Sequence, residues 1–206
     1  MNQLEIPIPE VSKVIQRFGN IPYVHERGPW LYPEGHPGDL TEGINCQMFF
    51  QEYLQAVTGF QIPREILSKE IFDDDSLFHN IPTSDLSTLQ TGDVFLFGRN
   101  IPTDLLDSRS LHLAGFSHYD SDSNEPILIH FLGNKKNEND NGEPIQTKVG
   151  ARTWPLSKFQ NPKYREKYGK LWGVKRLSPE SLINSETILT PGIETILSYF
   201  DKDKNN

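Results

Sequence analysis

The chain has 206 residues, of which 35% are hydrophobic and 11% aromatic, and its formal net charge is -8. This length and aromatic content predict one folded domain with a buried core rather than a disordered chain. The acidic balance argues against general binding to nucleic acid or to anionic membranes, because both depend on clustered lysine and arginine.

The compartment is predicted from the N-terminal segment and the cysteine count. The chain starts without the basic and apolar regions of a signal peptide, and no apolar run approaches the ~20 residues that span a bilayer. The single cysteine, Cys46, cannot form an internal disulfide, so folding does not require an oxidising compartment. We therefore expect a cytoplasmic protein without a membrane span, for which export would need a leaderless route.

The first predicted elements are helical. Residues 1–20 contain apolar positions at helical spacing and are expected to be partly helical. A loop rich in glycine and proline follows at 21–43. Beyond the next helix, residues 61–90 form a polar connection with one short helix near 63–71.

Residues 46–58 are the clearest predicted helix. Their apolar side chains recur at i, i+3, i+4, i+7, i+8 and i+11 from Cys46, which makes one continuous face. Asn45 is a suitable N-cap and Gly59 a suitable C-terminal stop. The inward face of this helix is expected to pack on a sheet.

Short strands follow this helix, each bounded by Gly, Pro, Asn or Asp. They are expected at 93–97, 111–116, 127–132, 148–152 and 171–177. The polar segment 133–147 is predicted to be a mobile loop, and 178–206 a C-terminal extension with a short helix at 193–200 and a frayed tail. A helix followed by consecutive strands predicts an α+β domain over residues 1–177, with an antiparallel sheet.

Cys46 is the candidate nucleophile. It opens the predicted helix, where unpaired backbone N–H groups and the helix dipole stabilise negative charge. A free thiol has a pKa of about 8.5, so this position favours the reactive thiolate. The alternative is a buried structural cysteine, which is a common environment for a lone thiol.

The candidate bases are His112 and His130, on two strands joined by the polar segment 117–126. If these strands form a hairpin centred near Ser121, the two side chains lie opposite each other, with Cβ atoms about 4.5–5.5 Å apart. His112 can then accept the thiol proton while His130 holds its ring, as in other nucleophile–base–orienter sets. A shift of one residue in register would put them on different faces.

Several motifs occur in a fixed order within residues 11–177. They are Phe-Gly-Asn-Ile-Pro-Tyr-Val at 18–24, Gly-Ile-Asn-Cys at 43–46, Leu-Gln-Thr-Gly-Asp-Val-Phe-Leu-Phe at 89–97, Leu-His-Leu-Ala-Gly-Phe at 111–116, Ile-Leu-Ile-His at 127–130 and Leu-Trp-Gly-Val-Lys-Arg at 171–176. Together they resemble the NlpC/P60 family of papain-like cysteine hydrolases. The Gly-Asp segment at 89–97 is the most distinctive match.

The resemblance implies a papain-like fold in which the nucleophile helix packs on an antiparallel sheet. It implies a triad of Cys46, His112 and His130 that needs no cofactor or metal. Cys46 would attack an amide carbonyl, and water would release the acyl-enzyme. The implied activity is that of a cysteine peptidase or amidase whose partner is a peptide or amide substrate.

The same resemblance implies substrate-binding positions at Tyr23, Asn45 and Gln47. Family members usually carry Asp and Ser where this chain has Asn45 and Gln47. In members that cleave peptidoglycan stem peptides, that pair helps to bind a free amine. The uncharged Asn45 therefore supports the amide chemistry more than this particular substrate.

Other functions are compatible with the same residues. The acyl-enzyme can pass its acyl group to an acceptor other than water, which would make the protein an acyltransferase or thioesterase. A metal site built from Cys46, His112 and His130 would lack the close-spaced ligand pairs typical of zinc sites.

The basic and aromatic segment 158–170 could bind nucleic acid, but the acidic chain favours a solvated surface. The acidic run 73–75 lacks the ligand spacing of a calcium loop and is expected at the surface. The sequence predicts no oligomeric state.

Overall fold

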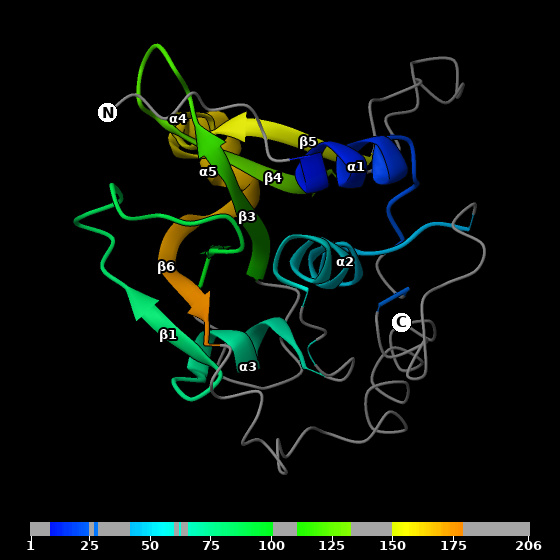
Figure 1. Cartoon of the computed structure of the whole chain (residues 1–206), viewed down its shortest axis with the longest axis horizontal. Helices are drawn as coiled ribbons and strands as arrows, with labels where there is room; N and C mark the ends of the chain where they lie inside the picture. The colour runs from blue at the N-terminus through cyan, green and yellow to red at the C-terminus, as the bar shows by residue number, and fades with distance from the viewer. Residues whose placement is uncertain are drawn as a thin grey trace.

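The computed structural model describes residues 9–24, 27–28, 42–59, 62, 66–100, 111–132 and 150–178. Within these residues the fold is mixed α+β, with one antiparallel sheet of strand order β1-β6-β2-β3-β4-β5 (Figure 1). The predicted loop at 133–147, the helix at 193–200 and most of the loop at 21–43 lie outside the described residues.

The elements largely follow the sequence pattern, with shifted ends. The helices are α1 (Pro9–Phe18), α2 (Cys46–Thr58), α3 (Ser68–Asp73), α4 (Leu156–Gln160) and α5 (Pro162–Tyr168). The strands are β1 (Phe78–Ile81), β2 (Val94–Gly98), β3 (Leu111–Tyr119), β4 (Pro126–Leu132), β5 (Gly150–Pro155) and β6 (Lys170–Leu177). The helix predicted at 46–58 and every predicted strand are confirmed, whereas β1 was assigned to a polar connection. None of the described helices is long and apolar enough to cross a bilayer.

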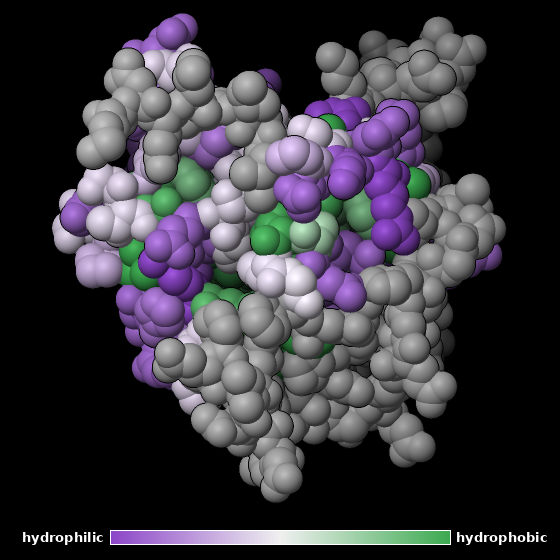
Figure 2. All heavy atoms as spheres, viewed as in Figure 1, coloured by the Kyte–Doolittle hydropathy of each residue, from purple (hydrophilic) through white to green (hydrophobic). Residues whose placement is uncertain are grey.

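Helices cover the sheet from both sides (Figure 1). On one side α2 packs on β3 and β4, and α1 packs on α2 and β5. On the other side α4 packs on β4 and β5, and its neighbour α5 joins the same hydrophobic cluster. The buried apolar side chains form two clusters, one on each face of the sheet. Because side chains alternate along a strand, each strand contributes to both clusters. The described part of the face in Figure 2 is largely hydrophilic, with hydrophobic atoms in small separate patches.

Helix α2 begins and ends with the predicted caps. The side chain of Asn45 accepts a hydrogen bond from the N–H of Met48 at 2.9 Å. Gly59 adopts a left-handed conformation with φ 76°, and its N–H bonds the carbonyl of Gln55 at 2.9 Å. These contacts satisfy helix-end groups that would otherwise lack partners.

Tyr53 fixes α2 against the sheet. A Cβ atom on Gly115 would lie only 2.1 Å from Cε1 of Tyr53, so only glycine allows this close approach. The Tyr53 hydroxyl donates to the carbonyl of Phe116 and accepts from the N–H of Gly92 at 3.0 Å. Both hydrogen-bonding capacities of this buried phenol are therefore used, and α2 is tied to the strand that carries His112.

The Gly-Asp motif has a structural role. The carboxylate of Asp93 is 1% exposed and accepts from Nε and Nη2 of Arg176, each at 2.7 Å. It also accepts from the N–H of Gln90 at 2.8 Å. This two-pronged ion pair joins the start of β2 to the end of β6.

The hairpin register differs from the prediction. His130 lies opposite Ala114 rather than His112, and the ladder shifts between Phe116 and His118. β3 continues to Tyr119 because the turn starts later, where Asp120 accepts from the N–H of Asp122 at 3.1 Å and of Ser123 at 2.9 Å. The offset is two residues, so the two imidazoles keep one face and become diagonal neighbours.

Candidate active site

Cys46 is the first residue of α2 and is half-buried. Its sulfur accepts hydrogen bonds from the hydroxyl of Tyr23 and from the backbone N–H of Leu113. The sulfur also accepts from the backbone N–H groups of Cys46 itself and of Gln47, at the start of the helix. The thiol is therefore held between the loop that carries Tyr23, the N-terminus of α2 and strand β3.

The sulfur of Cys46 lies where β3 and β4 separate. The N–H of Phe116 points toward β2, because it donates to the carbonyl of Asp93, just before β2, at 2.8 Å. Because successive N–H groups alternate between the two sides of a strand, the N–H of Leu113 points toward β4. The register of β3 with β4 begins at the pair Ala114 and His130. If the β3–β4 ladder continued by one more pair, the N–H of Leu113 would bond β4. It donates to the thiol instead, so the sulfur lies near the plane of the sheet.

The two predicted histidines are in contact. Nε2 of His112 lies 3.2 Å from Nδ1 of His130, and the two rings are nearly perpendicular at 86°. Alternation along β3 directs His112 away from α2, which packs against Gly115. On that other face the ring of Tyr168 lies 4.5 Å from the His112 ring, and the ring of Phe159 lies 4.9 Å from the His130 ring.

Helix α2 and the imidazoles therefore occupy opposite faces of the sheet. The structure brings His112 and His130 together, and it brings the sulfur of Cys46 to the backbone of Leu113, the residue after His112. The imidazoles were expected to meet the thiol on the face that packs α2. They lie instead on the other face, and the sulfur contacts β3 through the backbone N–H of Leu113.

Burial controls the protonation of the site. It raises the pKa of the Cys46 thiol, and the hydrogen bonds to the sulfur offset only part of this effect. The expectation of a stabilised thiolate is therefore wrong, because desolvation outweighs the helix N-terminus. Burial, with the charge of Lys167, lowers the pKa of His112 to about 3. Burial, with the charge on His112 next, also holds the pKa of His130 well below its usual value. At neutral pH the site contains a neutral thiol and two neutral imidazoles.

The three residues implied as substrate-binding have different environments. The hydroxyl of Tyr23 lies at the sulfur of Cys46. Asn45 and Gln47 are only 4% and 3% exposed. Asn45 caps α2, while the Gln47 amide donates to the carbonyl of Ile66. Both amides make hydrogen bonds within the fold, and a role of their side chains in substrate binding stays a prediction.

Segment 158–170 is the part of the site that sequence reasoning missed. It was expected to be a solvated surface, but Phe159 and Tyr168 are 1% and 7% exposed and pack against the imidazoles. The available signal was the spacing of Tyr164 and Tyr168, four residues apart, which is one helical face. Tyr164 extends this face by packing on Trp154.

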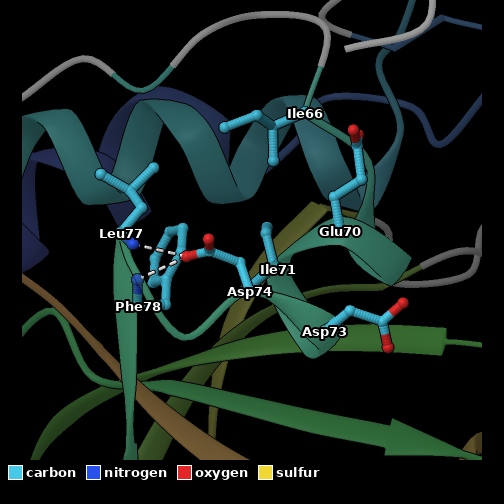
Figure 3. A pocket seen from close by; sticks show the side chains of 7 residues that line it. All are labelled: Ile66, Glu70, Ile71, Asp73, Asp74, Leu77 and Phe78. Atoms are coloured by element: carbon cyan, nitrogen blue, oxygen red, sulfur yellow. Dashed lines mark hydrogen bonds between the residues drawn. The ribbon is translucent and has the colours of Figure 1, made fainter. Parts of the chain in front are cut away.

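A separate cavity of about 250 Å³ lies between α3 and β1 (Figure 3). Its lining residues are Ile66, Glu70, Ile71, Asp73, Asp74, Leu77 and Phe78, so it contains none of the candidate catalytic groups. The carboxylate of Asp74 is occupied by the N–H groups of Leu77 at 2.6 Å and Phe78 at 2.8 Å. The acidic run thus caps a turn, and no cluster of three or more His, Cys, Asp or Glu suited to a metal occurs in the described part of the chain.

Comparison with known proteins finds no matching family model and no significantly similar curated sequence. The resemblance to NlpC/P60 hydrolases therefore stays a prediction. The predicted substrate, the absence of nucleic-acid partners and the cytoplasmic location stay predictions as well.

Proposed function

We propose that the protein is a cysteine hydrolase of the NlpC/P60 type that cleaves an amide bond in a peptide or related substrate. Cys46 is the nucleophile, His112 the base and His130 the residue that orients His112. The observation that carries the proposal is the contact of the sulfur with β3 at the residue next to His112. The sulfur accepts the N–H next to His112, and the His112 ring is held by His130 at 3.2 Å.

The contact between the imidazoles is compatible with a tautomer pair that suits the proposed roles. If Nε2 of His112 donates to Nδ1 of His130, Nδ1 of His112 keeps a lone pair that can accept the thiol proton. As His112 becomes cationic, Nδ1 of His130 accepts the Nε2–H bond and stabilises the charge. This is the role of an orienting residue in a catalytic triad.

The reaction starts from neutral groups. Cys46 transfers its proton to His112 while the sulfur bonds the carbonyl carbon and the carbonyl π electrons move to oxygen. When this tetrahedral intermediate collapses, the C–N bond breaks and His112 returns the proton to the leaving amine. Water then attacks the thioester and gives a proton to His112. The C–S bond breaks, the sulfur recovers the proton, and the acid product leaves.

The environment of Asn45 bears on the substrate. Its amide is buried as the cap of α2 and carries no charge, so it cannot pair with a free ammonium group. This favours a substrate whose amide is recognised without such an amine near the nucleophile.

The test is acylation of the full chain by p-nitrophenyl acetate, followed by intact mass and by release of p-nitrophenolate. We expect one acetyl group on Cys46 that water slowly removes, and no such adduct on the Cys46→Ala variant. His79→Gln is the matched control, because His79 lies exposed on β1. An adduct that persists in Cys46→Ala, or none in the natural chain, would overturn the proposal. Adding a primary amine to the acetylated protein separates hydrolysis from acyl transfer.

A further inference from the structure

Two buried polar atoms beside the candidate base have no hydrogen-bond partner among the described residues. They are the hydroxyl oxygen of Tyr168 and Nε2 of His130. Tyr168 is 7% exposed and His130 is 0% exposed. Leaving a buried polar group unpaired is costly, so such groups in a folded protein call for a reason. Both atoms belong to rings that pack against His112.

Tyr168 is rigidly positioned. It is the last residue of α5, and the next residue, Gly169, has φ 84°. A Cβ atom on Gly169 would lie 1.9 Å from the backbone carbon of Gly98, so this glycine brings the end of α5 onto the end of β2. The N–H of Gly169 also bonds the carbonyl of Arg165 at 2.8 Å. A hydroxyl fixed in this way loses little entropy when it binds a ligand.

The Tyr168 hydroxyl is also within electrostatic reach of the nucleophile. Burial raises the pKa of the Tyr168 phenol most, and the charges of Tyr164 and then of Cys46 add to this effect. The hydroxyl therefore stays protonated at neutral pH. It can gain a partner when a ligand arrives that accepts a hydrogen bond from its O–H or donates one to its oxygen. The sulfur itself already has donors in Tyr23 and the N–H of Leu113.

We propose that Tyr168 is a further catalytic residue, whose hydroxyl donates a hydrogen bond to the substrate carbonyl oxygen as that oxygen becomes negative. This role rests on the proposed hydrolase function. The oxygen has no such charge before Cys46 attacks, so the bond strengthens in the transition state and accelerates acylation. Tyr23 holds the sulfur and Tyr168 holds the substrate oxygen, from opposite faces of the sheet.

The test compares two reagents on the full chain. p-Nitrophenyl acetate acylates the thiol through a negatively charged oxygen, whereas iodoacetamide alkylates it by displacement without one. Tyr168→Phe is expected to slow acetylation of Cys46 by about 10² to 10³, the usual loss for one oxyanion donor. Alkylation should stay within about twofold of the natural chain. His79→Gln, exposed on β1, is the matched control and should change neither rate.

Each outcome separates the two claims. Equal slowing of both reagents in Tyr168→Phe would mean a structural role, and unchanged acetylation would mean no role, so either result overturns the inference. Acetylation that survives Cys46→Ala overturns the hydrolase function itself. The thermal midpoint gives a second readout, because removing an unpaired hydroxyl should leave it unchanged or raise it. A clear fall in the midpoint would show that the hydroxyl has a partner in the resting fold and would contradict the inference.

Discussion

The two faces of the sheet treat a buried tyrosine in opposite ways. On the α2 face, the Tyr53 hydroxyl uses both of its hydrogen-bonding capacities, with Phe116 and Gly92. On the α4–α5 face, the Tyr168 hydroxyl has no partner among the described residues, although its ring is packed against His112. The α2 face leaves this phenol no unused capacity, whereas the α4–α5 face leaves the Tyr168 hydroxyl and Nε2 of His130 without a partner among the described residues, beside the proposed base His112. This contrast distinguishes the face that packs α2 from the face that carries the proposed base.

The largest expected effect on stability comes from adding a side chain at Gly115, where the absence of a Cβ atom lets α2 approach β3. Gly115→Ala would put a Cβ atom 2.1 Å from the Tyr53 ring, whose hydroxyl is held at both ends. We expect the free energy of unfolding to fall by about 3 kcal/mol, as for severe overpacking. Urea denaturation measures this loss. Gly173→Ala is the matched control, because a Cβ atom there meets nothing within 4 Å, and an equal loss in both variants would refute the packing argument.

A smaller effect should distinguish the two tyrosines. Tyr53→Phe leaves the carbonyl of Phe116 and the N–H of Gly92 without their buried partner, so we expect a loss of about 2 kcal/mol in the free energy of unfolding. Tyr168→Phe removes a hydroxyl without a partner and should cost nothing. Parallel urea titrations test the pair. Similar losses of free energy of unfolding in both variants would contradict the difference proposed between the two tyrosine hydroxyls.

The sequence predicted what local signals determine. The helix at 46–58 was recoverable because its apolar period and both caps, Asn45 and Gly59, lie within a few residues of each other. Strand β1 was missed because its partner β6 lies far along the chain, with Phe78 opposite Leu177. The hairpin register was wrong by two residues because Asp120 delays the turn and the ladder shifts near Phe116.

The candidate site was predictable only in part. The contact between His112 and His130 was predicted from a hairpin that put both side chains on one face. The register was wrong by two residues, and a shift of two keeps both side chains on the same face. The state of the thiol did not follow, because position at a helix N-terminus is local whereas desolvation depends on what the tertiary fold packs around the sulfur. The contribution of Tyr168 was hidden for the same reason, since only the fold turns a basic surface segment into a cover over the imidazoles.

The most direct test of the account is the pH dependence of Cys46 acetylation by p-nitrophenyl acetate in the natural chain and in His112→Gln. The pKa of the thiol is raised and that of His112 is lowered to about 3, so at pH 7 a neutral base must take the proton of a neutral thiol. We predict that His112→Gln is slower by about 10² or more at pH 7. The ratio should shrink as the pH rises through the thiol pKa, because a thiolate needs no base. Equal rates for the two proteins at pH 7 would contradict the account.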